Sequence, residues 1–174
     1  MSLIRVLMMF CVAVTITSCG SNTSPSSTTT PTACSGGNRG SMIARINGAA
    51  WTATCITTAS FSGGIISLGA TDGAQSIGLS VTFLGLGDYT MTPLDPTNPP
   101  KQLMLASGLV NLVPTSAASW TANSGTPGSS GTLTLTSSTT TAVTGTFSFT
   151  AVATPGTGAA GTKVVTNGGF NITF

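Results

Sequence analysis

Hydrophobic and polar residues alternate along most of the chain beyond residue 40. The clearest alternation runs through a segment whose apolar positions are Ile77, Leu79, Val81 and Phe83. Successive side chains of a β-strand point to opposite faces, so this pattern predicts a strand with one buried and one solvated face. After residue 18 the sequence carries no helical period of comparable strength and no internal repeat.

Segments with this alternation recur at short intervals and predict about nine or ten short strands. They span residues 42–46, 51–55, 64–70, 74–83, 88–91, 103–111, 117–122, 131–137, 143–152 and 163–174. Asn47-Gly48 is expected to turn the chain, and Asp72-Gly73 favours a type I′ hairpin turn because it tolerates positive φ. We therefore predict a single all-β domain over residues 41–174, an antiparallel β-sandwich or a closed β-barrel. The alternation does not separate these two architectures.

The composition excludes the common catalytic machinery. Charged residues make up 5% of the chain, histidine is absent, and the acidic residues are Asp72, Asp88 and Asp95. Without histidine or glutamate the chain cannot form Ser-His-Asp, Cys-His or paired-glutamate sites, and scattered aspartates disfavour calcium. We predict no enzyme, catalytic residue, metal or cofactor. The few lysines and arginines cannot neutralise a row of phosphates, so no nucleic-acid partner is expected.

The first eighteen residues are typical of a secretory signal. Arg5 precedes an apolar run that is too short for the ~20 residues of a membrane-spanning helix. The run ends in Ile16-Thr17-Ser18-Cys19, which resembles the bacterial lipobox. The resemblance implies that residues 1–18 are removed and that Cys19 is acylated, which tethers the protein to a membrane. Gly20 is not the Asp of an inner-membrane retention signal, so an outer membrane is favoured if the host has two membranes.

Residues 19–40 are predicted to be the lipidated cysteine and a stalk. From residue 21 to residue 32 the chain holds only Ser, Thr, Pro and Asn, a composition that cannot bury apolar surface and is expected to stay disordered. Cys34 and Cys55 then remain as an even pair in an exported chain. An oxidising compartment favours a disulfide between them, and no histidine or third nearby cysteine is present to make a metal site.

Three segments of the domain form a further pattern: MIARING at 42–48 followed by Trp51, TGTFSFTA at 144–151, and TNGGFN at 166–171. In this order and spacing they resemble a family of small bacterial lipoprotein domains of unknown function. The resemblance covers residues 41–174 and implies the β architecture and the lipid anchor. It implies no catalytic residue.

Two functional hypotheses follow. In the first, a non-catalytic module of the cell envelope, structural or adhesive, works through its sheet surface, and an envelope protein is one candidate partner. In the second, Tyr89 and Trp120, with the Pro-rich segment 92–102, bind a glycan or an apolar molecule. Outward rows of hydroxyls are expected over 132–136 and at Ser148 and Thr150. Threonine suits strands in general, so these rows alone assign no ligand.

Overall fold

The computed structural model of the chain describes residues 39–91, 106–112 and 118–174. These residues form eleven β-strands and no helix, which confirms the all-β class. Accordingly, no helix in these ranges is long and apolar enough to cross a membrane. The strands are β1 (Gly40–Ile46), β2 (Ala49–Thr52), β3 (Cys55–Ser62), β4 (Ile65–Thr71), β5 (Gln75–Thr82), β6 (Gly87–Thr90), β7 (Ala106–Leu112), β8 (Ser119–Ala122), β9 (Ser130–Ser138), β10 (Ala142–Ala153) and β11 (Thr162–Thr173).

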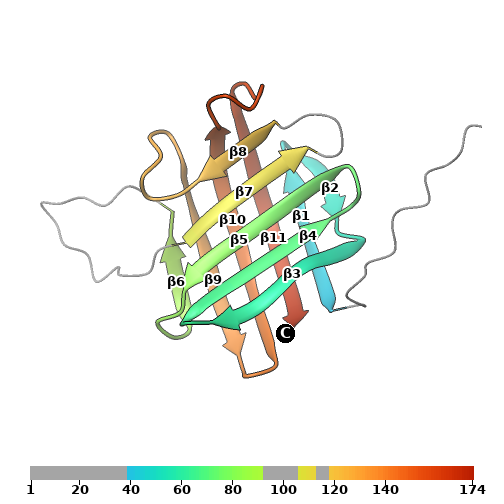
Figure 1. Cartoon of the computed structure of the whole chain (residues 1–174), viewed down its shortest axis with the longest axis vertical. Helices are drawn as coiled ribbons and strands as arrows, with labels where there is room; N and C mark the ends of the chain where they lie inside the picture. Colours follow the sequence, from blue (N-terminus) through green and yellow to red (C-terminus); the bar gives the residue numbers. More distant parts are fainter. Residues whose placement is uncertain (1–38, 92–105, 113–117) are drawn as a thin grey trace, which may run out of the picture.

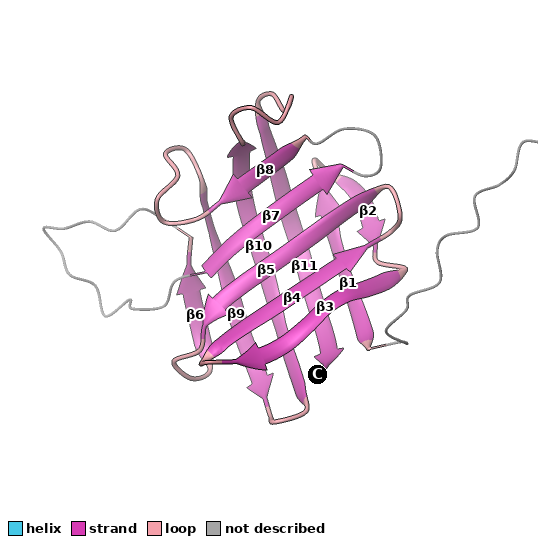
Figure 2. Ribbon diagram, in the orientation of Figure 1, coloured by secondary structure: helices cyan, strands magenta, loops and turns pink. Residues whose placement is uncertain are grey.

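Hydrogen bonds join the strands into one antiparallel sheet that folds into two facing layers. The front layer has the order β8-β7-β5-β4-β3 and lies diagonally across the back layer, β6-β9-β10-β11-β1-β2 (Figure 1, Figure 2). The long strand β10 belongs to both layers, because one of its edges pairs first with β9 and then with β8. Among the described residues no ladder joins β3 to β2 or to β6. The molecule is therefore a β-sandwich and not a closed barrel.

The core lies between the two layers and follows the alternation of the sequence. Ile77, Leu79 and Val81 on β5 are at most 3% exposed. On the back layer the rings of Phe147 and Phe149 lie 6.1 Å apart, and the ring of Phe170 on β11 lies 6.3 Å from that of Phe147. These rings form the centre of the inner face of the back layer, since aromatic side chains bury the largest apolar areas.

Glycines allow these rings to approach the neighbouring strands closely. A Cβ atom on Gly108 of β7 would lie 2.8 Å from the ring of Phe149, and one on Gly168 of β11 would lie 2.5 Å from the ring of Phe147. Both distances are shorter than a carbon–carbon contact permits. Because these glycines have no Cβ atom, they leave the space that the phenylalanine rings of the core occupy.

The turns agree with the sequence at one hairpin and differ at the other. Asn47 and Gly48 both have positive φ, 49° and 82°, as a two-residue hairpin turn of type I′ requires. At Asp72-Gly73 the hairpin forms, but only Gly73 has positive φ and the loop runs from Asp72 to Ala74. The Asp72 carboxylate instead accepts the backbone N–H groups of Ala74 and Gln75 at 2.8 and 2.6 Å. This side-chain cap replaces the expected type I′ geometry.

The strand β3 is an addition to the expected set. The sequence predicted a strand over 51–55, whereas the structure ends β2 at Thr52 and starts a new strand at Cys55. Only Ile56 of β3 is fully buried, because β3 lies at the edge of the front layer. A mostly exposed Ser/Thr/Ala strand carries no strong alternation, so periodicity could not reveal it.

Candidate functional site

Tyr89, a predicted ligand-binding residue, is completely buried on β6. Its hydroxyl donates to the carbonyl of Gly85 and accepts the N–H of Leu84 at 3.1 Å. These bonds run four and five residues back along the chain, and they are similar to the tyrosine corner of other β-sandwiches. Tyr89 thus fixes the loop between β5 and β6.

Trp120, the second predicted ligand-binding residue, is 5% exposed on β8. Its Nε1 donates to the carbonyl of Ala160 at 3.2 Å, and Nζ of Lys163 lies 4.7 Å from the centroid of its ring. The cation therefore covers part of the ring face, as in a cation–π contact. By comparison, the buried Nε1 of Trp51 on β2 has no hydrogen-bond partner among the described residues.

The two predicted ligand-binding rings lie in different layers, Tyr89 in the back layer and Trp120 in the front layer. Both are covered by protein, and their polar atoms are occupied by backbone groups. The Pro-rich segment 92–102 lies outside the described residues. Binding of a glycan or an apolar molecule by this pair stays a prediction that no described contact favours.

The predicted lipidation site and half of the predicted disulfide also lie outside the described residues. Cys19, Cys34 and Asp95 belong to the ranges that the structure does not describe. Cys55 begins β3 and is partly buried. The lipid anchor and the Cys34–Cys55 disulfide therefore stay predictions.

Hydroxyl side chains line the outer surface of the back layer. Thr90 of β6 pairs with Thr132 of β9, which also pairs with Ser148 of β10. A parallel row joins Asp88, Thr134 and Thr146 in the same order of strands, and a third joins Thr144 to Asn171 of β11. Directly paired residues of an antiparallel sheet project from the same face. We call this surface the hydroxyl face: Asp88, Thr90, Thr132, Thr134, Thr144, Thr146, Ser148 and Asn171.

The hydroxyl face is held in place by the core beneath it. Leu133 and Leu135 alternate with its threonines on β9, and Phe147 does so on β10; all three side chains are at most 3% exposed. A slip by one residue would expose these apolar groups, so the register is fixed. Within the face, Oγ1 of Thr134 donates to Oδ1 of Asp88 at 2.6 Å. The rows are therefore an ordered array on a rigid support.

The chemistry available on the hydroxyl face is hydrogen bonding with little charge. Each threonine hydroxyl can donate and accept, and branching at Cβ restricts the side chain to few rotamers. Asp88 is its one ionisable side chain. In the described part of the chain, no three cysteine or acidic side chains gather in a way that could hold a metal ion.

Sequence reasoning predicted part of the hydroxyl face. The rows over 132–136 and at Ser148 and Thr150 were expected to point outward, and Thr132, Thr134 and Ser148 belong to the face. The other members of the face, Asp88, Thr90, Thr144, Thr146 and Asn171, were missed. For Asp88 and Thr90 the reason is that β6 meets β9 across a separation of 46 residues. The alternation at 88–91 was the available signal, because it places the side chains of Asp88 and Thr90 on one face of the strand and those of Tyr89 and Met91 on the other.

The fold and this face define a small β-sandwich protein whose outer sheet surface is rich in hydroxyl groups. The chain belongs to the family described as "Domain of unknown function (DUF6252)", whose model matches residues 38–172. This is close to the stretch 41–174 over which the sequence resembled a family of unknown function. No curated protein and no solved structure gives a significant match to the chain.

Proposed function

We propose that this protein is a lipid-anchored protein of the bacterial cell envelope whose sandwich is a non-catalytic adhesive module. Its hydroxyl face is the contact surface, and its partner is an uncharged, hydroxyl-rich polysaccharide of the envelope. The observation that carries the proposal is the cross-strand register of Thr90, Thr132 and Ser148, with Asp88, Thr134 and Thr146 beside them. An extended row of fixed hydroxyls suits an extended polymer better than a small ligand.

Pre-ordered hydrogen-bonding groups favour this kind of binding. A glycan presents many hydroxyls that must exchange water for protein, and each exchange contributes only about 0.5–1.5 kcal/mol. Several contacts in register are therefore needed. Because the β-branched threonines stand on a packed sheet, little side-chain entropy is lost when they bind.

The anchor in this proposal is the acylated Cys19. The secretory signal of residues 1–18 and the lipobox Ile16-Thr17-Ser18-Cys19 support it, and Gly20 favours an outer membrane. Two or three acyl chains give durable membrane attachment, whereas one does not. The Ser/Thr/Pro-rich residues that follow would act as a stalk between the bilayer and the sandwich.

The anchor is tested by metabolic labelling of the full chain. Labelled palmitate is expected to enter the wild-type protein and to be absent from a Cys19→Ser variant, and only the wild type is expected to float with membranes in a density gradient. Equal labelling of the two proteins, or release of the wild type into the medium without detergent, would contradict the anchor.

The adhesive surface is tested by cosedimentation of the mature protein with purified envelope polysaccharide. A Thr134→Val/Thr146→Val variant keeps the shape and strand preference of both side chains but removes two hydroxyls. It is expected to bind about tenfold more weakly, since two hydrogen bonds together are worth roughly 1–3 kcal/mol. The matched control is Thr58→Val/Thr82→Val, which changes two exposed threonines of the front layer. If both variants bind like the wild type, or both lose binding equally, the hydroxyl face is not the contact surface.

A further inference from the structure

Large apolar side chains gather at one end of the sandwich. They come from the β3–β4 hairpin, from the segment between β5 and β6, and from the residue after β11. Four of them are well exposed: Phe61 at 40%, Ile65 at 45%, Leu84 at 53% and Leu86 at 56%. We call this surface the apolar end: Phe61, Ile65, Phe83, Leu84, Leu86 and Phe174.

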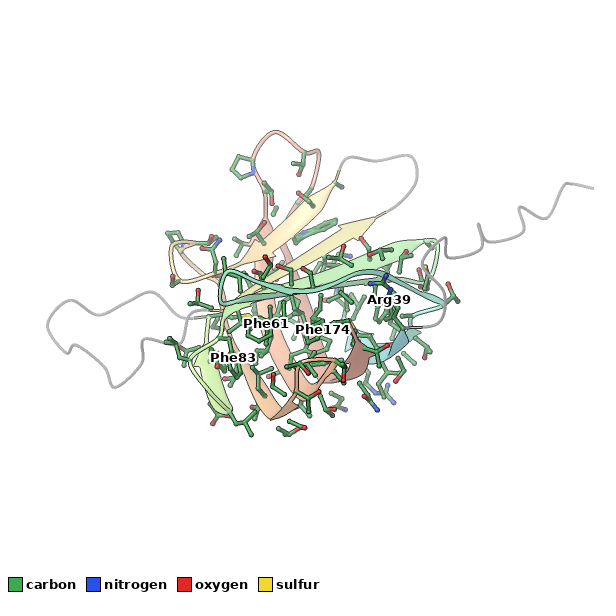
Figure 3. The ribbon with its side chains drawn as sticks, turned by 60° about the horizontal axis from the view of Figure 1, so that its bottom comes forward. Arg39, Phe61, Phe83 and Phe174 are labelled. Atoms are coloured by element: carbon green, nitrogen blue, oxygen red, sulfur yellow. The ribbon has the colours of Figure 1, made fainter. Side chains whose placement is uncertain are left out.

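The aromatic part of the apolar end is one connected group. The ring of Phe61 meets that of Phe83 edge-on at 5.3 Å between centroids, and the ring of Phe174 lies 6.1 Å from that of Phe61. Figure 3, which brings this end of the molecule forward, shows the three labelled phenylalanines beside one another. A contiguous apolar surface of this kind on a soluble domain marks a contact site for a protein or a membrane.

The chain enters the sandwich at this same end. The carbonyl of Arg39 accepts the N–H of Thr173 at 2.7 Å, next to Phe174, and the Arg39 guanidinium reaches the carbonyl of Ala59 at 3.5 Å. The described part of the chain therefore begins beside the apolar end.

The opposite end of the sandwich carries most of the charged side chains, although the exposed Val164 also lies there, bonded to Asn47. It carries Arg45, whose guanidinium bonds to the carbonyl of Gly48 in the β1–β2 turn at 2.8 Å. It also carries Asp72 in the β4–β5 turn and Lys163 near the start of β11. Three of the five charged side chains in the described ranges thus lie at this end, whereas Arg39 lies beside the apolar end and Asp88 follows Leu86 by two residues.

We propose that the apolar end rests on the bilayer to which Cys19 tethers the protein. This inference deepens the proposed function and rests on its lipid anchor. Cys19 and Arg39 are about twenty residues apart, and a coil of that length spans about 25 Å, so the bilayer stays within reach at high effective concentration. Phenylalanine and leucine insert at the level of the headgroups, and a cation such as Arg39 is attracted to anionic lipids. The hydroxyl face, which runs along the strands, then faces sideways and stays free of the membrane.

The test is amide hydrogen exchange on the mature, acylated protein in vesicles of phosphatidylethanolamine and phosphatidylglycerol. The reference is the Cys19→Ser chain in solution without lipid. In vesicles, exchange in peptides covering 61–66 and 83–87 is expected to slow by about fivefold or more, because lipid excludes water from these loops. The turns at 47–48 and 72–74, at the opposite end, are expected to exchange at the same rate in both samples.

Two variants make the test specific. Leu84→Ser/Leu86→Ser removes two side chains that are more than half exposed, so it should fold and be acylated but lose the protection. Ile43→Ser/Val164→Ser is the matched control, because these side chains are 50% and 42% exposed but lie away from the apolar end. This control is expected to keep the protection.

The outcomes separate this inference from the anchor itself. If the wild type is acylated and floats with membranes but its apolar end is unprotected, or both ends are protected equally, the anchor stands and the inference is overturned. Protection that arises without lipid as protein concentration increases would assign the apolar end to a second copy of the chain and also overturn it. If Cys19 is not acylated in the wild type, the anchor and the inference that rests on it are both overturned.

Discussion

Glycine sets how closely the phenylalanine rings of the core approach the neighbouring strands. Gly168 and Gly169 show this at adjacent positions of β11. A Cβ atom on Gly168 would lie 2.5 Å from the ring of Phe147, whereas the nearest atom to one on Gly169 is a side-chain carbon of Ile43 at 3.8 Å. The two positions therefore differ in the space available to a methyl group.

We expect Gly168→Ala to lower the free energy of unfolding by about 2–3 kcal/mol, because the ring of Phe147 must move within a packed core. Gly169→Ala, the adjacent control, is expected to change it by less than about 0.5 kcal/mol. Urea denaturation followed by circular dichroism measures both. Equal effects of the two substitutions would contradict the conclusion that Gly168 leaves space for the ring of Phe147.

The sequence indicated which aromatic residues belong to the core but not what their polar atoms do. The period-two positions of Phe147 and Phe170 predicted their burial, and both are buried. The partners of Tyr89 and Trp120 could not be predicted in the same way. Trp120 meets Ala160 across 40 residues, and only the completed fold brings them together.

At the scale of single elements, Tyr89 connects a strand to the loop that precedes it. Its hydroxyl holds Leu84 and Gly85, which belong to the exposed segment between β5 and β6. That segment also carries part of the apolar end. The corner therefore positions the loop that we propose to lie on the membrane.

We expect Tyr89→Phe to lower the free energy of unfolding by about 1–2 kcal/mol, because two backbone groups lose their buried partner while the ring stays in place. Hydrogen exchange of the Leu84 amide is expected to accelerate. Exchange of the backbone amides on β11 is expected to change only as far as the free energy of unfolding changes. Mass spectrometry of exchanged peptides checks both. An unchanged Leu84 amide in a fully folded variant would show that the hydroxyl does not order the loop.

Strand prediction succeeded where one face of a strand is buried and failed where it is not. β5, β10 and β11 match the expected segments to within a residue or two at each end. β3 was missed because its Ser/Thr/Ala side chains lie mostly in solvent at an edge. The choice between sandwich and barrel was also beyond the sequence, since it depends on the second pairing of β10 and on edges that stay open.

At the scale of the whole molecule, the predicted disulfide would join the stalk to the domain. Cys34 precedes the sandwich, and Cys55 begins β3 at the edge of the front layer. The bridge would close a loop of about twenty residues, which constrains the unfolded chain.

We expect a reducing agent to lower the stability of the wild type by roughly 3 kcal/mol and to leave a Cys34→Ser variant unchanged. Thermal unfolding with and without reductant makes this comparison, and thiol titration under denaturing conditions is the direct check. Two free thiols beyond Cys19 in the unreduced wild type would contradict the disulfide.

Strand β1 is hydrogen-bonded on both sides, to β2 and to β11, and the chain enters it at Gly40. A pull between the membrane and a polymer held on the sheet would therefore load β1 along its own axis. The ladders on its two sides would have to shear together instead of unzipping one bond at a time. The fold would therefore resist force best in the direction of its attachment, which suits the tethered adhesive module that we propose.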